Sequence, residues 1–401
     1  MRSLHVIPSV SQIRGGTSQA VLDMVKALRA KNIDAEIATT NDNGDSILNV
    51  SLQERIQYHQ VPIWFFNRFS PSVKFLSEYA VSSDLTQWLW YNISNYDIVH
   101  IHAIFSYAPT ITMLIAQLKN IPYIVTPHGL LCKWSLQQST LKKQIYLKII
   151  EQANLNYSQG LHFTSEQEEQ EASQLHLTSP SFILPHGIYI PPTIPDARQR
   201  LRQHFNLALD EPIILFLSRL HPKKGLNYLI PALSKLSHHR FTLILAGSGD
   251  PDYDNEIRSL VIDRGIQNRT YFTGFVQGEF KELLMQGADL FTLTSYSENF
   301  GLSVLEALAV GLPVLVTPGV ALANIVAQQS IGYVTELDVD AIASTLQKAL
   351  DYPQDAKNRG DRARQFILEN YTWDRVGTKM LSVYKNIVKS EPISALSHHQ
   401  I

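Results

Sequence analysis

Two glutamates stand eight residues apart in the stretch SENFGLSVLEALAVG, residues 297–311. Apolar or small residues surround Glu306 on nearly every side of a helical wheel, so the sequence predicts a buried helix that offers its carboxylate no polar stripe. A carboxylate in such a place is destabilising unless a partner pairs with it or donates hydrogen bonds to it. Glu298 and Glu306 therefore need partners that this apolar stretch does not itself supply.

A basic loop, SRLHPKKG at residues 218–225, follows the apolar run IILFL. Arg219 and Lys224 lie five residues apart, and Gly225 stands where the next helix is expected to begin. The planar guanidinium fork and the ammonium point charge together suit a diphosphate. A solvated loop with no ligand is the alternative, and the loop in isolation leaves it open.

Glycine pairs follow two other expected strands. RGGTSQA, residues 14–20, places Gly15 and Gly16 before a helix whose backbone N–H groups could approach a diphosphate, although a tight turn alone would explain them. AGSGDPD, residues 246–252, carries Asp252 where a dinucleotide-binding fingerprint would have its third glycine. The second stretch therefore argues against a dinucleotide site.

Residues of metal-ligating type also occur. The acidic residues at 250–254 and 338–340 could bind a metal with a diphosphate, but solvated helix-start carboxylates are favoured because the basic loop already offers cations. His100 and His102 would share one strand face, as zinc ligands can, yet no third ligand is evident and satisfied strand-end histidines are favoured. The single cysteine, Cys132, excludes an internal disulfide framework and is expected to be inert.

The elements that must position these residues alternate between short apolar runs and helical periodicity. The second half has the strand candidates IILFLS, FTLILAG, TYFTGFV, DLFTLT and PVLVTP, and the first half has LHVI, AEIATT, IQYHQV, DIVHIH, YIVTP, LHFTS and FILP. Continuous apolar strands separated by helices predict parallel sheets covered on both faces. The motifs directly follow strands, where a doubly wound domain binds phosphates.

A proline-rich connection, PHGIYIPPTIPDAR, separates the two halves. It predicts an N-terminal Rossmann-like domain at 1–191, a C-terminal one at 192–371 and a frayed tail at 391–401. The 401 residues, 45% hydrophobic and 17% charged with a formal net charge of −2, exclude a general attraction to nucleic acid. The start MRSLHVIPSV is expected to be a strand and not a signal peptide, so we expect a cytosolic enzyme.

The stretches RGGTSQAVLDMVKALRAKN, DIVHIH, TPHGLL, SRLHPKKG, LAGSGD and SENFGLSVLEALAVGLPVLVT together resemble the retaining glycosyltransferases of family four. The resemblance implies the GT-B fold, an α/β architecture with two Rossmann-like doubly wound domains facing across a cleft. It also implies that a helix at about 372–390 crosses back to the first domain. The segment from TPHGLLCKW to IIEQANL resembles members that build exopolysaccharide, capsule or lipopolysaccharide.

The resemblance implies roles for individual residues. Glu298 would contact hydroxyls of the donor sugar, and Glu306 would accept hydrogen bonds from the ribose. Arg219 and Lys224 would neutralise the departing diphosphate, with no metal and no cofactor besides the nucleotide-sugar co-substrate. His128 would lie beside the sugar, so the catalytic candidates are His128, Glu298, Arg219 and Lys224. The donor-binding candidates are Gly15, Gly16, Arg219, Lys224, Gly247, Phe275, Glu298, Asn299, Phe300, Gly301, Leu302 and Glu306. The sequence departs from the family at His186, where asparagine is commoner.

The implied reaction moves a hexose from UDP-hexose or GDP-mannose to a glycan or glycolipid acceptor in cell-surface polysaccharide or glycolipid synthesis. No residue in the loops is placed as a nucleophile or as an opposite-face base, so retention by front-face transfer is expected. A sugar-nucleotide epimerase, a PLP-dependent phosphorylase and a non-catalytic nucleotide-sugar-binding protein remain as alternatives.

The acceptor side stays open. The aromatic residues of VPIWFFNRFSPSVKF, residues 61–75, could line an acceptor cleft or touch lipid, but core packing is the favoured explanation for Trp64 and Phe65. The segment STLKKQIYLKII, residues 139–150, combines lysines with apolar residues. It could rest on an anionic membrane surface at the inner face of the membrane, or be an ordinary amphipathic helix.

Overall fold

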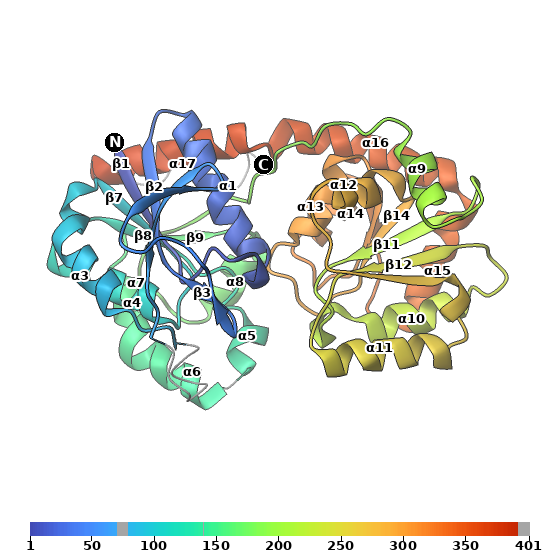
Figure 1. The fold of residues 1–401 in the computed structure, drawn as a ribbon, viewed down its shortest axis with the longest axis horizontal. Coiled ribbons are helices and arrows are strands. Elements are labelled where there is room, and N and C mark those ends of the chain that lie inside the picture. Colours follow the sequence, from blue (N-terminus) through green and yellow to red (C-terminus); the bar gives the residue numbers. More distant parts are fainter. Residues whose placement is uncertain (70–78, 139, 392–401) are drawn as a thin grey trace. The chain divides into compact units, whose positions relative to one another are not determined.

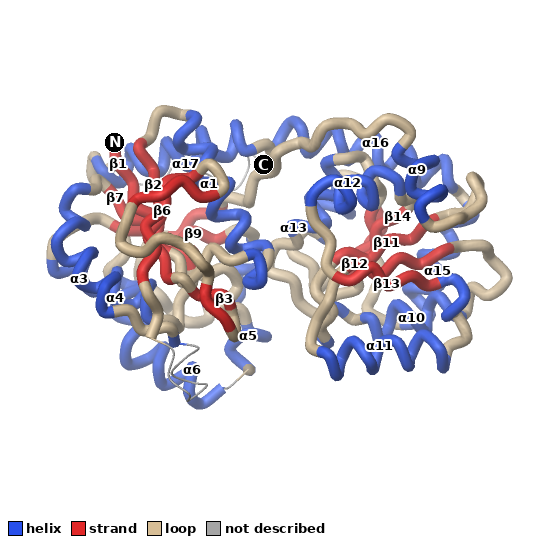
Figure 2. Tube along the Cα trace, viewed as in Figure 1, coloured by secondary structure: helices blue, strands red, loops and turns tan. Residues whose placement is uncertain are grey.

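A computed structural model describes residues 1–69, 79–138 and 140–391 of the chain. The chain divides into two compact units. Unit 1 comprises Met1–Gly187 together with Trp373–Ile401, and unit 2 comprises Ile188–Thr372. Within each unit, helices surround a central layer of strands, as the ribbon and the tube both show (Figures 1 and 2).

Unit 1 is built on an eight-stranded sheet in the order β10-β9-β8-β7-β1-β2-β6-β5. All neighbouring strands run parallel except β5, which is antiparallel to β6. The strand order changes direction between β1 and β7, so the loops after these two strands flank the switch point of the sheet. The strands are β1 (Arg2–Val6), β2 (Asp34–Thr40), β5 (Arg55–Tyr58), β6 (Val61–Phe66), β7 (Ile98–His102), β8 (Tyr123–Thr126), β9 (Gly160–Phe163) and β10 (Ser181–Ile183), with a separate short hairpin of β3 (Asp42–Asn43) and β4 (Ser46–Ile47).

One strand prediction in unit 1 was wrong. IQYHQV was expected to be a single strand, but the chain turns back at His59 and Gln60, which have φ angles of 48° and 66°. Two successive residues in the left-handed region make the tight turn that joins antiparallel strands. The segment is therefore the β5–β6 hairpin, and the aromatic residues that follow belong to the buried strand β6.

The helices of unit 1 include a segment from the far end of the sequence. Helix α17 lies beside α1, where Gly377 faces Ala27 closely enough that an added Cβ would come within 3.2 Å of the Ala27 Cβ (Figure 1). Trp373, Met380 and Tyr384 of α17 are buried in the core of this unit. The helical segments are η1 (Gln12–Arg14), α1 (Gly16–Ala30), α3 (Ser83–Asn92), η2 (Ile93–Asn95), α4 (Tyr107–Leu118), α5 (Lys133–Gln137), α6 (Thr140–Tyr146), the π-helical η3 (Leu147–Glu151), α7 (Gln152–Asn156), α8 (Glu166–Ser173) and α17 (Trp373–Val388).

Unit 2 contains a six-stranded, fully parallel sheet in the order β13-β12-β11-β14-β15-β16. This is the doubly wound order in which the chain starts in the middle, moves to one edge and then fills the other side. The switch point lies between β11 and β14. The strands are β11 (Ile213–Leu217), β12 (Thr242–Ala246), β13 (Thr270–Gly274), β14 (Leu290–Leu293), β15 (Val314–Val316) and β16 (Gly332–Val334).

Helices cover both faces of this sheet, as the sequence alternation predicted. They bury a continuous apolar core with the strands, from Leu201 of α9 to Ile367 of α16. The helical segments are α9 (Ala197–His204), η4 (Pro222–Lys224), α10 (Leu226–Ser234), α11 (Pro251–Asp263), η5 (Gln267–Arg269), α12 (Gly278–Gly287), α13 (Leu302–Ala309), α14 (Ala323–Gln328), α15 (Val339–Asp351) and α16 (Pro353–Asn370). Among the described helices of both units, none has the length and apolar character needed to cross a membrane.

Candidate functional site

In unit 2 the loops after β11 and β14 meet at the switch point. Gly225 has a φ of 69° and lies so close to the Thr294 carbonyl oxygen that an added Cβ would collide with it. The Tyr296 N–H donates a hydrogen bond of 2.9 Å to the Lys223 carbonyl oxygen. These contacts hold the basic loop against the loop that carries Glu298, and they explain why a glycine follows Lys224.

Lys224 and Glu298, both predicted site residues, form an ion pair. Both side chains are mostly buried, with 12% and 20% of their surfaces exposed. Arg219 lies exposed in the same loop and has no ion-pair partner among the residues that the structure describes. Burial lowers the pKa of His221 between them, and the positive charges of Arg219 and Lys224 lower it further. The loop therefore presents positive charge, and its Lys224 is already paired with Glu298.

The second glutamate does not lie in the setting that its sequence suggested. The Glu306 side chain is 29% exposed, and its Oε1 lies 2.6 Å from Nζ of Lys281 on α12. Leu302 and Val310 lie one turn before and after Glu306 and are also only half-buried. The prediction of a fully buried helix was therefore wrong, because the side of α13 that carries Leu302, Glu306 and Val310 is partly exposed.

Lys281 is a candidate site residue that the sequence motifs did not reveal. It precedes Glu306 by 25 positions, and no periodic signal connects it to the SENFG motif. The neighbouring Glu282 has its pKa raised by burial, while Lys281 partly opposes this change. Both glutamates of the motif are thus paired with lysines that come from earlier elements of the same unit.

The backbone between Glu298 and α13 is firmly held. The Glu298 N–H donates to the Gly319 carbonyl oxygen at 2.7 Å, and the Glu298 carbonyl oxygen accepts from Ala321 N–H at 3.0 Å. Gly301 has a φ of 88° at the start of α13, and the Phe300 side chain is buried in the core. Phe300 and Gly301 can therefore meet a ligand mainly through their backbone, at the amino end of α13.

A third loop lies next to the basic loop. Gly247, with a φ of 141°, packs against the Ser218 carbonyl oxygen and donates its N–H to the Gly274 carbonyl oxygen at 2.8 Å. The N–H of Gly247 is thus already hydrogen-bonded within the protein. What this glycine gives the site is the close packing of its loop against the basic loop. Phe275, directly after β13, is 61% exposed and presents an aromatic ring at the same edge of the sheet.

The acidic triplets serve as helix caps. The Asp250 side chain accepts a hydrogen bond of 3.0 Å from Asp252 N–H at the start of α11. Asp338 accepts hydrogen bonds from the N–H groups of Asp340 and Ala341 at the start of α15, at 2.9 and 3.0 Å. The favoured reading of these aspartates as helix-start carboxylates is confirmed.

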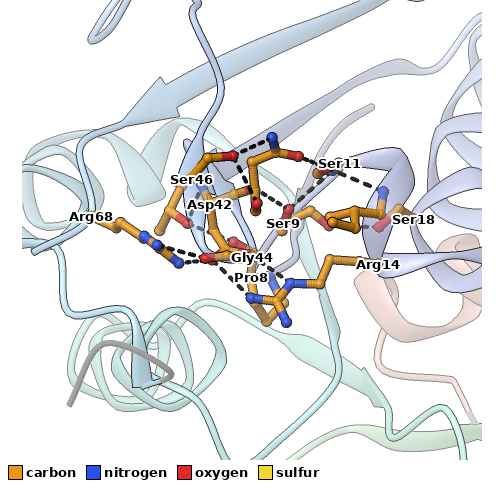
Figure 3. Close-up of polar contacts among 12 residues, drawn as sticks. Pro8, Ser9, Ser11, Arg14, Ser18, Asp42, Gly44, Ser46 and Arg68 are labelled. Carbon is orange, nitrogen blue, oxygen red and sulfur yellow. Dashed lines mark hydrogen bonds and ion pairs between the residues drawn. The ribbon is translucent and has the colours of Figure 1, made fainter. Parts of the chain in front are cut away.

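In unit 1, Gly15 and Gly16 lie in a turn at the start of α1. Figure 3 shows a polar network that includes Arg14 and Ser18, on either side of this turn. Gly15 has a φ of 83°, and Gly16 begins α1. The buried carboxylate of Asp42 accepts hydrogen bonds of 2.7 and 2.9 Å from the Arg14 guanidinium and forms an ion pair with Arg68. The network joins the loops after β1 and β2, so the glycine turn has a defined position in this unit.

Smaller hydrogen bonds complete this network. The Ser9 hydroxyl donates to the Asp42 carbonyl oxygen at 2.7 Å, and the Ser18 hydroxyl of α1 donates to the Ser9 carbonyl oxygen at 2.9 Å. Arg68 also donates to the Gly44 carbonyl oxygen at 2.7 Å (Figure 3). The loop after β1 is therefore anchored on both sides of the glycine pair.

Unit 1 also holds a cluster of buried histidines. His100 and His102 lie on β7 as predicted, and His5 of β1, which sequence reasoning missed, completes a group whose ligand-type nitrogens all lie within 4.8 Å of one another. His128 follows β8 with a φ of 53°, and its ring stacks on that of His186 at 5.6 Å between centroids. The departure from the family at His186 is thus an aromatic contact to His128.

Burial keeps these imidazoles neutral. It lowers the pKa of His5 to about 3, that of His162 to about 4 and that of His186 to about 3. It also lowers the pKa values of His100, His102 and His128 well below the usual value, with neighbouring histidines as a further cause. Each ring therefore carries a single N–H at neutral pH.

The two segments that the sequence suggested for acceptor binding differ in how far their apolar side chains are buried. Phe65 and Phe66 are fully buried, and Trp64 packs on Trp88 with 5.1 Å between ring centroids, so core packing explains them. Residues 70–75 of that segment lie outside the described residues. On α6 and η3, the side chains of Leu141, Ile145 and Ile149 are exposed at a spacing of four residues.

Two family descriptions match the chain. "Glycosyl transferases group 1" matches residues 197–366, within unit 2, and "Glycosyl transferase 4-like domain" matches residues 15–182, within unit 1. An uncharacterized glycosyltransferase of Methanocaldococcus jannaschii is 34% identical over 46% of this chain, which spans about half (47%) of that relative. A D-inositol 3-phosphate glycosyltransferase of Jonesia denitrificans is 25% identical over 92% of this chain and 91% of its own length.

The solved structures agree on the fold. HepE of Anabaena, in complex with UDP and glucose, superposes with a TM-score of 0.76 at 18% identity, covering 96% of this chain and all of the other. This likeness shows the GT-B fold with its two Rossmann-like units. The chain belongs to the group 1 glycosyltransferases, so the family expected from its motifs is confirmed. It is a glycosyltransferase that acts with nucleotide sugars.

Proposed function

We propose that this glycosyltransferase moves a hexose from UDP-hexose or GDP-mannose to a glycan or glycolipid acceptor, with retention of configuration and without a metal ion. The observation that carries the proposal is the pairing of Lys224 with Glu298 beside the exposed Arg219 at the switch point of unit 2. This is the edge at which doubly wound sheets bind phosphorylated ligands. Two cations and one sugar-binding carboxylate suit the two halves of a nucleotide sugar.

The ion pair implies that Lys224 exchanges its partner Glu298 for the diphosphate when the donor binds. In the free protein Lys224 and Glu298 neutralise each other. A diphosphate carries more charge than one carboxylate, so Lys224 would turn toward it and leave Glu298 able to accept hydrogen bonds from sugar hydroxyls. Arg219 would add a second, bidentate contact to the phosphates. In the free protein, the ion pair thereby holds in place both the lysine that would bind the diphosphate and the glutamate that would bind the sugar.

Glu306 and Lys281 fit the nucleoside half of the donor. A carboxylate accepts hydrogen bonds from both hydroxyls of a ribose, and the ion pair with Lys281 orients Glu306 before the ligand arrives. Phe275 offers an exposed ring for contact with the base, together with the backbone around it. Within unit 1, the backbone of Gly15 and Gly16 suits a diphosphate, and the imidazole of His128 suits a sugar.

The chemical step follows from these charges. The bond between the anomeric carbon and the diphosphate oxygen breaks as the acceptor oxygen bonds to the same face of that carbon. The acceptor proton passes to the departing diphosphate, whose negative charge Arg219 and Lys224 stabilise. Because the side-chain cations take the place that a divalent ion has in other transferases, we propose that no metal is needed.

The acceptor is proposed from family likeness and from one surface feature. Leu141, Ile145 and Ile149 expose apolar side chains on one face, and Lys148 is exposed beside them. An apolar stripe flanked by positive charge suits a lipid-linked acceptor at an anionic membrane surface. We therefore place the reaction in cell-surface polysaccharide or glycolipid synthesis, at the inner face of the membrane.

Thermal unfolding with free nucleoside diphosphates tests the donor site. At one hundred times the dissociation constant, a ligand stabilises the folded state by about 2.7 kcal/mol. Of UDP, GDP and ADP, we expect UDP or GDP to raise Tm in excess EDTA, and nucleotide-sugar turnover to persist there. No shift with any of them, or turnover that requires added manganese, would refute the proposed donor site.

The two glutamates should differ when each is changed to glutamine. Glu306→Gln removes the carboxylate assigned to the ribose, so we expect it to weaken binding of the free nucleoside diphosphate. Glu298→Gln removes the carboxylate assigned to the sugar, so we expect near-normal diphosphate binding and a large loss of transfer. Calorimetric titration of both variants checks this, and equal loss of diphosphate affinity would contradict the assignment.

A further inference from the structure

A continuous chain of side-chain hydrogen bonds crosses the sheet of unit 1 and ends at His128. It starts at the Leu184 carbonyl oxygen after β10 and passes through His162 of β9 and Thr126 of β8. It continues through His100 of β7, Tyr384 of α17, His5 of β1 and His102 of β7. The successive contacts measure 2.7, 2.8, 2.6, 2.7, 3.3, 3.0 and 3.1 Å, the last joining His102 Nδ1 to His128 Nε2.

The carbonyl group at the start determines the direction of the first bond. A carbonyl oxygen can only accept, so His162 must carry its proton on Nε2 to make the 2.7 Å contact with Leu184. A neutral imidazole has one N–H, so His162 Nδ1 is an acceptor and takes the hydroxyl proton of Thr126. The Thr126 oxygen is then free to accept from His100 Nε2–H.

The same argument passes through the rest of the chain. His100 Nδ1 accepts from the Tyr384 hydroxyl, whose oxygen in turn accepts from His5 Nε2–H. His5 Nδ1 then accepts from His102 Nε2–H, and His102 Nδ1 accepts from His128 Nε2–H. All seven hydrogen bonds are satisfied by one arrangement of protons. In that arrangement His128 Nδ1 is left as an acceptor.

No described residue donates a hydrogen bond to His128 Nδ1. It is a buried atom without a hydrogen-bond partner among the described residues. A buried acceptor left unpaired destabilises the folded protein, so a ligand that supplies a donor there restores the missing hydrogen bond. The stacked ring of His186 and the left-handed backbone at His128 keep the imidazole in place.

Three histidines that lie this close together could instead bind a zinc ion. Both ring nitrogens of His5, His100 and His102 are already engaged in the hydrogen-bond chain. Metal binding would require these contacts to break and the rings to turn within a fully buried environment. The contacts therefore favour the hydrogen-bond chain.

We propose that the chain holds His128 in its Nε2–H tautomer, so that Nδ1 presents a lone pair to a hydroxyl group of a bound ligand; its positioning residues are His5, His100, His102, Thr126, His162 and Tyr384. The ligand class that fits is one with a hydroxyl donor, such as a sugar. Only the effect on transfer rests on the proposed function, since the tautomer is a property of unit 1 alone. Tyr384 makes the C-terminal helix α17 part of this device.

Replacing Tyr384 by phenylalanine tests the inference. The change removes the hydroxyl that accepts from His5 and donates to His100, and so disconnects His5, His102 and His128 from the carbonyl anchor. These three rings can then reverse their shared hydrogen bonds, which moves the His128 proton to Nδ1. We expect long-range proton–nitrogen NMR to show one His128 tautomer, Nε2–H, in the unchanged protein and a mixture in Tyr384→Phe.

Tyr123→Phe is the matched control. Tyr123 is equally buried in unit 1, but its hydroxyl contacts Gln117 and Asn154, outside the chain. We expect Tyr123→Phe to lose stability as Tyr384→Phe does and to keep the single His128 tautomer. If Tyr384→Phe does not fold, Thr126→Val breaks the chain at another link with little change of shape, and the same mixture is expected.

The outcomes separate this inference from the proposed function. A His128 proton on Nδ1 in the unchanged protein, or a spectrum unaffected by Tyr384→Phe and by Thr126→Val, would overturn the inference. Uptake of one equivalent of zinc by His5, His100 and His102 would overturn it as well. We also expect Tyr384→Phe to lower kcat/KM for transfer by roughly two- to tenfold with nucleoside diphosphate affinity unchanged. Because the spectra need no donor, failure of every nucleotide sugar to react would refute the proposed function alone.

Discussion

Lys224→Ala is expected to lower kcat/KM for sugar transfer by roughly ten- to a hundredfold, since a charge-assisted contact to the leaving diphosphate is worth about 1.5–3 kcal/mol. The loss should exceed that of Arg219→Ala. Lys224 is paired with Glu298, and its removal leaves that carboxylate uncompensated where the diphosphate must bind. Arg219 has no such partner in the described part of the chain.

Steady-state kinetics of the double variant measure this coupling. In Lys224→Ala/Glu298→Gln the repulsive charge is gone, so the combined loss should be smaller than the product of the two single losses. Lys235→Ala is the control, because Lys235 pairs with Asp340 at the surface of the same unit and should have little effect. Independent effects of Lys224 and Glu298 would show that their ion pair has no part in donor binding.

Acid should destabilise this protein steeply below pH 6.5. Burial lowers the folded-state pKa of His5 to about 3, of His162 to about 4 and of His186 to about 3, against about 6.5 in the unfolded chain. Between those values the unfolded state binds protons that the folded state does not. Stability is therefore complete above pH 6.5 and falls by up to about 1.4 kcal/mol per pH unit for each such histidine.

Urea unfolding between pH 7.5 and pH 4.5 checks this expectation. His5→Gln should reduce the slope of unfolding free energy against pH by the share of one histidine, even if the variant is less stable overall. His176→Asn replaces an exposed histidine of unit 1 at a φ of 52°, which asparagine tolerates, and is the control for a histidine substitution outside the buried cluster. A flat profile from pH 6.5 to pH 4.5 would mean that the histidines are protonated in the folded state.

The fold was predictable because its signals are local. Continuous apolar strands such as IILFL and TLILA alternate with amphipathic stretches, and that alternation alone requires parallel sheets covered by helices. The β5–β6 hairpin was missed because its turn residues, His59 and Gln60, are not the glycine or asparagine that usually mark such a turn. When residues of other types adopt the left-handed conformation, the sequence gives no signal that predicts the turn.

The candidate site was predictable only in part, because the sequence does not show which side chains contact one another in the fold. Lys224 and Glu298 were both selected from motifs, yet their ion pair depends on β11 and β14 being neighbours in the sheet. Lys281 sits on an ordinary amphipathic helix and becomes notable only through its contact with Glu306. His5 looked like a strand residue, and only its pairing with His100 across β1 and β7 reveals the cluster.

The anomeric configuration of the product tests the central claim most directly. An α-linked nucleotide sugar is incubated with the protein, and proton NMR follows the first-formed glycoside, or the sugar released to water before it mutarotates. We predict an α-configured product, with one nucleoside diphosphate released for each sugar transferred. A β-configured first product, or an epimerised nucleotide sugar formed without release of the diphosphate, would contradict the account.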